Sequence, residues 1–136
     1  MILNHENLSQ IRVRYADTDQ MGYCYYGNYP TFLEVGRVEA LRTLGLTYKT
    51  MEEQGHLMPV ADLKIKYLRP AYYDDLLTIL TRILRIEGSR VYFDYVIFNE
   101  KKEKIITATT TLVFVSKDTM RPVAPPAYFL NLFHAQ

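Results

Sequence analysis

The chain has 136 residues, of which 49% are hydrophobic, 13% aromatic and 23% charged. This length and composition predict one globular domain, residues 1–136, and they exclude disordered and collagen-like proteins. Sixteen basic and fifteen acidic side chains leave a net charge of +1, which argues against nucleic acid or an anionic membrane as the main partner. A single cysteine, an N-terminus unlike a signal peptide and the lack of a long apolar run favour a soluble, cytoplasmic protein.

The first third of the chain is predicted to form a strand followed by a long helix. Apolar residues alternate with polar ones before an acidic run that starts at Asp17; they are Ile11, Val13 and Tyr15. Farther on, apolar or small residues recur at steps of four and three, the spacing of one helical face: Tyr29, Leu33, Gly36, Ala40 and Leu44. We expect Asn28 to cap this helix, Pro30 to lie in its first turn and Gly45 to end it in a left-handed conformation.

The remainder of the chain is predicted to be rich in strands. A short helix over 48–54 precedes four strands, over 60–68, 76–86, 90–99 and 105–116, and an apolar stripe predicts a terminal helix near 128–133. The turns between the strands suit an antiparallel meander. One long helix and about five strands fit an α+β fold in which a curved antiparallel sheet wraps the helix, and its open edges favour self-association.

Two acidic residues, Asp17 and Asp19, stand in the loop between the first strand and the long helix. Carboxylates close to each other or to apolar rings can have one pKa raised toward neutrality, as a general base requires. The alternative is that both side chains only accept hydrogen bonds from backbone amides in a turn.

The start of the long helix is a second candidate for chemistry. Backbone amides of residues 26–29 should point out of a helix N-terminus that carries a partial positive charge, where a polarised carbonyl oxygen or a phosphate can bind. Gly27 would permit close approach of the backbone. Packing in a core or an interface is the alternative for the four tyrosines there. A carboxylate beside such amides combines two parts of an acyl-transfer site.

These residues resemble the hotdog-fold acyl-CoA thioesterases of the 4-hydroxybenzoyl-CoA thioesterase group, including the YbgC-like enzymes. The matching positions are Tyr15, Asp17, Thr18, Asp19, Gly22, Tyr25, Asn28 and Tyr29, followed by Glu34, Arg37, Tyr67, Pro70, Asp74 and Asp75. The resemblance implies a hotdog fold and hydrolysis of an acyl-CoA thioester to free acid and coenzyme A. It implies that Asp19 is the nucleophile or general base, that the Tyr26 amide polarises the carbonyl, and that Asp17 has a structural or pKa-tuning role.

The predicted substrate-binding residues lie in two regions. The first is the loop and helix start, with Gly22, Tyr25, Gly27, Asn28 and Tyr29. The second is the strand over 60–68, where Lys64 and Lys66 alternate with apolar residues and either hold the phosphates of coenzyme A or are simply solvated. Four arginines are equally suited to the phosphates: Arg69, Arg82, Arg85 and Arg90. The acyl group stays open, because Tyr23 and Cys24 replace the small β-branched pair usual in the family.

The resemblance also implies a homodimer, often a homotetramer, in which two protomers share one continuous sheet and the site lies between subunits. We expect no cofactor beyond the coenzyme A of the substrate, and no metal, because the three histidines are isolated and Cys24 has no cysteine or histidine nearby. Nucleotide-binding fingerprints are missing from the sequence. Two alternatives are a thioesterase that acts on acyl carrier protein and a hotdog protein that binds acyl-CoA without hydrolysing it.

Overall fold

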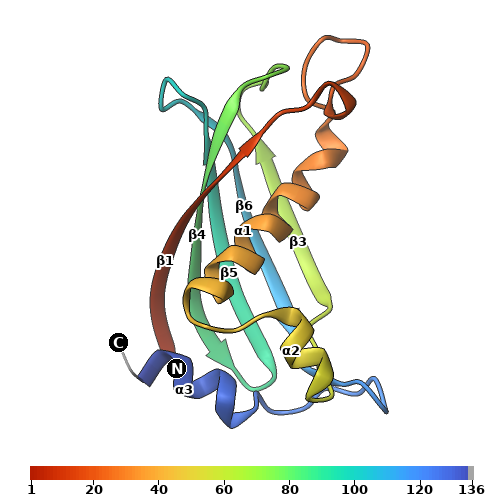
Figure 1. Cartoon of the computed structure of the whole chain (residues 1–136), viewed down its shortest axis with the longest axis vertical. Coiled ribbons are helices and arrows are strands. Elements are labelled where there is room, and N and C mark those ends of the chain that lie inside the picture. Colours follow the sequence, from red (N-terminus) through yellow and green to blue (C-terminus); the bar gives the residue numbers. More distant parts are fainter. Residues whose placement is uncertain (135–136) are drawn as a thin grey trace.

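A computed structural model describes residues 1–134 of the chain. The elements are β1 (Ile2–Arg12), the 3-10 turns η1 (Tyr15–Asp17) and η2 (Tyr26–Asn28), α1 (Tyr29–Thr43), α2 (Tyr48–Glu53), β2 (His56–Leu57), β3 (Val60–Tyr67), β4 (Leu76–Glu87), β5 (Arg90–Phe98), β6 (Lys104–Val113), β7 (Val115–Ser116) and α3 (Ala127–His134). Figure 1 shows α1 lying across one face of a curved sheet. The predicted α+β fold, with one long helix and about five main strands, is confirmed. No described helix is long and apolar enough to cross a membrane.

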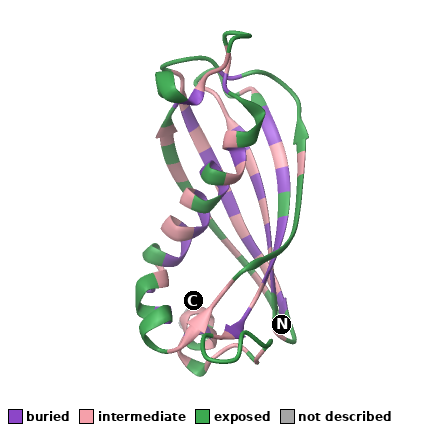
Figure 2. Ribbon diagram, turned by 90° about the vertical axis from the view of Figure 1, so that its right-hand side faces the viewer, coloured by how far each residue is buried: buried purple, intermediate pink, exposed green. Residues whose placement is uncertain are grey.

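The core lies between α1 and the concave face of the sheet. Along β4 and β5 the residues alternate between buried and partly buried, and Figure 2 shows such alternating bands on the strands of the sheet. One face of each strand therefore turns toward the helix. The buried face of α1 includes four members of the predicted stripe and three further residues: Tyr29, Phe32, Leu33, Gly36, Arg37, Ala40 and Leu41. The fifth, Leu44, follows the end of the helix and is partly buried. Gly45 has the expected left-handed φ of 94° just after the helix.

The order of the strands differs from the predicted meander. The five-stranded sheet has the order β1-β4-β5-β6-β3, so β3 pairs with β6 at an edge instead of with β4. The segment that follows β3 crosses from this edge to the region next to β1. There the amide of Val13 bonds to the carbonyl of Asp75, and the amide of Asp74 bonds to the carbonyl of Val13, both at 2.9 Å. This crossing inserts β4 between β1 and β5.

The edge strand β3 also lacks the buried apolar face that its alternating sequence predicts. All of its residues except Ile65 are exposed, including Leu63 and Tyr67 on the side of the sheet that carries α1. The reason is that α1 packs on β1 and β4 and does not cover this edge. The structure therefore has an open, partly apolar sheet edge.

Two strand boundaries also differ from the prediction. β1 begins at Ile2 and ends at Arg12. Its first part was not predicted because three successive inward positions, His5, Asn7 and Ser9, are polar and hide the alternation. The predicted strand over 105–116 is divided at Phe114, whose amide bonds to the carbonyl of Ser89. The second piece, β7, pairs with the short strand β2, which the sequence pattern did not predict.

Candidate active site

The loop between β1 and α1 is folded on itself and tied to the rest of the molecule by its backbone. The amide of Asp19 bonds to the carbonyl of Tyr23 at 3.1 Å, and the amide of Tyr25 bonds to the carbonyl of Asp17 at 2.8 Å. A further bond of 2.7 Å joins the amide of Cys24 to the carbonyl of Ala71, after the edge strand. The loop thus holds the acidic run beside the start of α1.

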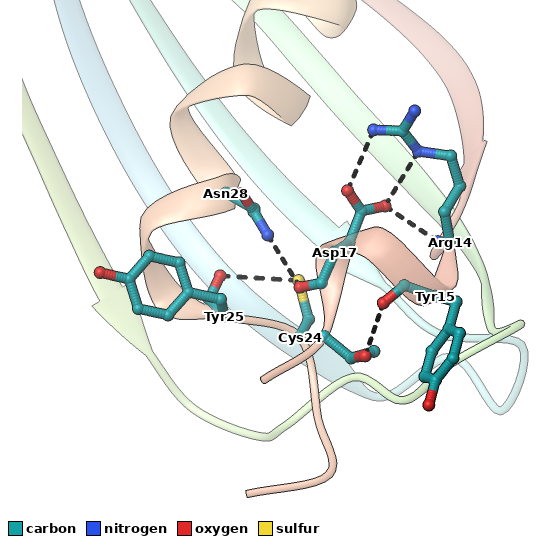
Figure 3. Close-up of polar contacts among 7 residues, drawn as sticks. Arg14, Tyr15, Asp17, Cys24, Tyr25 and Asn28 are labelled. Atoms are coloured by element: carbon teal, nitrogen blue, oxygen red, sulfur yellow. Dashed lines mark hydrogen bonds and ion pairs between the residues drawn. The ribbon is translucent and has the colours of Figure 1, made fainter. Parts of the chain in front are cut away.

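Asp17 has a structural role in this loop. Its side chain is almost fully buried, and its carboxylate accepts hydrogen bonds from the backbone amide of Arg14 at 2.9 Å and from the guanidinium at 3.1 and 3.4 Å (Figure 3). The hydrogen bond to Asp17 is the main reason why the pKa of Arg14 is raised. Both oxygens of Asp17 are therefore engaged within the protein.

Asn28 does not cap α1 as predicted. Its backbone is already helical, and its side-chain amide instead donates to the carbonyl oxygen of Asp17 at 2.8 Å (Figure 3). A helical conformation at this position turns the side chain away from the first amides of the helix, which a capping residue in extended conformation would reach. Asn28 thus ties the acidic loop to the helix start.

Asp19 is bound differently from Asp17. It is half-buried, and its Oδ1 accepts one hydrogen bond of 2.9 Å from the amide of Met21, as expected for a turn. Its other oxygen, Oδ2, has no hydrogen-bond partner in the described part of the chain. Asp19 lines an open cleft together with Tyr15, Ala16, Thr18 and Gln20. One oxygen of Asp19 is therefore available to a ligand.

The segment before α1 presents two amides without a partner inside the helix. Residues 26–28 form the 3-10 turn that continues directly into α1, and the amide of Asn28 bonds back to the carbonyl of Tyr25 at 3.0 Å. The first amides of a helical segment have no acceptor within it, which leaves those of Tyr26 and Gly27 as donors. They lie at the positive end of the dipole of α1.

A pocket of about 550 Å³ adjoins this helix start and is rich in tyrosine. It is lined by Met21, Tyr23, Cys24, Tyr26, Tyr29, Tyr67, Leu68, Arg69, Pro70 and Tyr72. Burial raises the pKa of Cys24 to about 11, and the charges of Asp17 and Asp19 contribute to that shift. Burial likewise raises the pKa of Tyr29. Both groups are therefore neutral at physiological pH and form an uncharged wall of the pocket.

The structure brings together only some of the predicted site residues. Tyr26 and Tyr29 line the tyrosine-rich pocket, whereas Asp19 lines the neighbouring cleft of the same loop. Gly22 forms a turn with a φ of 86°. Gly27 lies under the ring of Tyr25, where a Cβ would come within 2.6 Å of a ring carbon. These glycines and Tyr25 thus shape the loop.

Lys64 and Lys66 lie on the other face of the sheet. They pair with Thr109 and Thr107 of β6 and line a groove of about 430 Å³ on the face opposite to α1. The same groove contains Arg82, whose guanidinium is bound to Asp94 at 2.8 Å. Within one chain these lysines do not share a cavity with Asp19 or Tyr26, and their role in binding phosphate stays a prediction.

One contact at the site was not predicted from the sequence. The hydroxyl of Tyr67, on the edge strand β3, donates to the carbonyl oxygen of Tyr26 at 3.0 Å. The two residues are 41 positions apart, so no local spacing signals this contact. Among residues 1–134, no group of three or more histidine, cysteine or acidic side chains is arranged to hold a metal ion.

Comparison with known proteins identifies relatives over most of the chain. The family model described as "Thioesterase superfamily" matches residues 21–106. The protein YneP of Bacillus subtilis is 38% identical over 119 residues, which are 88% of this chain and 86% of YneP. The acyl-CoA thioesterase YbgC of Haemophilus influenzae is 35% identical over 91% of both chains. The solved structure of a DHNA-CoA thioesterase from Staphylococcus aureus has a TM-score of 0.89 and 36% identity, and the match covers 96% of this chain and 87% of that one.

Proposed function

The chain belongs to the thioesterase superfamily and has the hotdog fold expected from its sequence; from this premise we propose that it hydrolyses acyl-CoA thioesters with Asp19 as the reacting carboxylate. The observation that carries the assignment is the difference between the two acids of the loop. Both oxygens of Asp17 are bound by Arg14, whereas Asp19 lines an open cleft and its Oδ2 has no partner among the described residues. Of the two acids, Asp19 is therefore the one with an unbound carboxylate oxygen for a substrate or a water molecule.

The helix start supplies the second part of the reaction. A thioester oxygen that accepts hydrogen bonds from the amides of Tyr26 and Gly27 gains negative charge as the carbonyl carbon is attacked, and fixed donors stabilise that charge. In one route Asp19 attacks the carbon, the C–S bond breaks, coenzyme A leaves as a thiolate that takes up a proton, and water then hydrolyses the anhydride. In the other route Asp19 removes a proton from the water that attacks. Both routes yield free acid and coenzyme A and regenerate the carboxylate.

We further propose that two copies of the chain pair along β3. Residues that lie opposite each other in an antiparallel pair point to the same face of the sheet. A two-fold axis at Leu63 or at Lys64 therefore places a lysine of each copy opposite Asp62 of the other, which is a favourable charge pair. The pairing also covers part of an exposed apolar surface. In one chain, Leu63 is 42% exposed and Tyr67 is 48% exposed. Static light scattering of the purified protein measures the mass of the assembly and so tests whether the chain forms a dimer.

The activity is tested by following thioester absorbance with an aromatic, a short-chain and a long-chain acyl-CoA. We expect hydrolysis by the wild-type protein and a loss of about 10²- to 10⁴-fold in Asp19→Asn, the range for removal of a general base. Asp118→Asn is the matched control, since Asp118 is an exposed acid in the turn after β7 and should leave the rate unchanged. A loss of less than about tenfold in Asp19→Asn would exclude the assigned role of this residue.

A nucleophilic role of Asp19 is tested by a single turnover in water labelled with ¹⁸O. A nucleophilic carboxylate forms an anhydride with the acyl group, and attack of water on the Asp19 carbon of that anhydride transfers label to the protein. A general base leaves the protein unlabelled, and all label enters the free acid. Label in the peptide that contains Asp19, detected by mass spectrometry, establishes the nucleophilic route, whereas an unlabelled peptide is the result for a general base and for attack of water on the acyl carbon of the anhydride.

A further inference from the structure

Tyr67 connects the edge strand of the sheet to the start of α1. Its hydroxyl donates to the carbonyl oxygen of Tyr26 at 3.0 Å. Its ring makes edge-to-face contacts with the rings of Tyr26 and Tyr29, at centroid distances of 6.1 and 5.7 Å. Burial raises the pKa of Tyr67, so the phenol keeps its proton and remains a donor at physiological pH. The contact is therefore both polar and sterically defined.

The carbonyl that Tyr67 binds belongs to a peptide group with a free donor. In a trans peptide the C=O and the N–H point in opposite directions, so the Tyr26 carbonyl and the Gly27 amide are fixed together. The preceding peptide group is held in the same manner, because the carbonyl of Tyr25 accepts from the amide of Asn28 at 3.0 Å. Both peptide groups are thus anchored at their carbonyl ends, and their N–H ends belong to Tyr26 and Gly27.

We propose that Tyr67 is a positioning residue that orients the amide of Gly27, beside that of Tyr26, toward the oxygen of the thioester. This inference rests on the proposed function and adds to it a residue from the edge strand β3. A hydrogen bond to a carbonyl also polarises its amide, which strengthens the N–H as a donor. The orientation of the amide donors at the helix start then depends on the sheet edge as well as on the helix.

The variant Tyr67→Phe removes the hydroxyl and keeps the ring with its contacts. Deletion of one oxyanion donor costs about 10²- to 10³-fold in kcat, and a donor that is present but poorly oriented should cost less, about tenfold. We expect kcat to fall by about that factor, with KM within about twofold and thermal stability unchanged. A hydroxyl that only contacts the substrate would raise KM instead, and one that only packs would change neither; both results overturn the proposal.

The matched control is Tyr92→Phe. Tyr92 lies on β5 with the Arg85 guanidinium 3.9 Å from its ring centroid and takes no part in the pocket, so its hydroxyl should not affect kcat. A double variant adds a spectroscopic measurement that does not depend on turnover. In Asp19→Asn with bound benzoyl-CoA, the infrared stretch of the thioester carbonyl reports its polarisation by the amides. Adding Tyr67→Phe should shift the stretch back toward its value in solution; an unchanged stretch contradicts the proposal.

The proposed function and the role of Tyr67 are tested separately. A wild-type protein that hydrolyses no acyl-CoA excludes the proposed function and, with it, the role of Tyr67. Hydrolysis that depends on Asp19 but proceeds equally well in Tyr67→Phe leaves the proposed function intact and excludes Tyr67 as a positioning residue.

Discussion

Gly36 is the point where α1 is held against the sheet, so the addition of one methyl group there tests the packing of the helix. A Cβ on Gly36 would collide with Oγ1 of Thr81 and lie 3.0 Å from Cγ2 of Ile79, both on β4. Both side chains are fully buried, and their branched Cβ atoms restrict them to few rotamers. Neither neighbour can move aside without disturbing the core.

Two opposing effects determine the stability of Gly36→Ala. Alanine in a helix interior is favoured over glycine by about 1 kcal/mol, whereas an extra methyl group in a packed core costs about 1–3 kcal/mol. Because the new group meets two rigid neighbours, the cost should fall near the upper end and leave a net loss of about 1–2 kcal/mol. For a chain of this size the melting temperature should fall by about 3–10 °C.

A double-mutant cycle measured by urea unfolding isolates the contact. Thr81→Ala removes the colliding hydroxyl, so Gly36→Ala should cost less in that background, with a coupling energy of about 1–2 kcal/mol. Thr31→Ala is the control for a substitution in α1, because Thr31 is exposed. A Gly36→Ala variant as stable as the wild type, or equally destabilised with and without Thr81, would refute this account of the packing.

Three further predictions concern a thiol, a buried cation and the sheet edge. Burial raises the pKa of the Cys24 thiol from 9.0 to about 11, so this thiol should react with Ellman's reagent at pH 8 far more slowly in the folded than in the unfolded protein. For the same reason its contribution to the free energy of unfolding should decline as pH rises from about 9 to about 11. Arg37 is 93% buried and bonds to the hydroxyl of Tyr95 with no carboxylate partner among the described residues. Arg37→Met should therefore leave the free energy of unfolding unchanged or higher, whereas Tyr95→Phe should lower it by about 1–3 kcal/mol. Leu63→Glu should yield a folded monomer in light scattering with kcat reduced, and adding Tyr67→Phe to it should reduce kcat little further.

Local features of the fold were predictable because their causes lie within a few residues. The period of α1, Pro30 in its first turn and Gly45 after its end each depend on neighbours one or two turns away. The position of β3 was not predictable in this way. Pairing with β6 depends on contacts between residues about 40 to 50 positions apart, and the alternating pattern of β3 is the same whether its apolar face is covered or open.

The same difference between local and long-range contacts applies to the candidate site. The residue pattern located the acidic loop and the helix start, but only the family resemblance gave Asp19 the reacting role and Asp17 a structural or pKa-tuning one, since both acids fit a turn. The separating contact is local: Arg14, three residues before Asp17, binds both of its carboxylate oxygens. A basic residue at that spacing was therefore a signal that could have identified Asp17 as structural. The bond from Tyr67 to Tyr26 carried no such signal, because it joins elements that only the folded sheet brings together.

The open sheet edge gives a physical reason for assembly and catalysis to depend on each other. An edge strand that pairs on one side only opens more readily than a central strand, and β3 has few buried contacts to restrain it. Tyr67 stands at the end of this strand, so each opening also releases the carbonyl of Tyr26. A second copy paired along β3 would supply the missing row of hydrogen bonds and hold the amides of the helix start in place. On these proposals the unpaired edge of β3, which a second copy covers, also determines the orientation of the oxyanion donors.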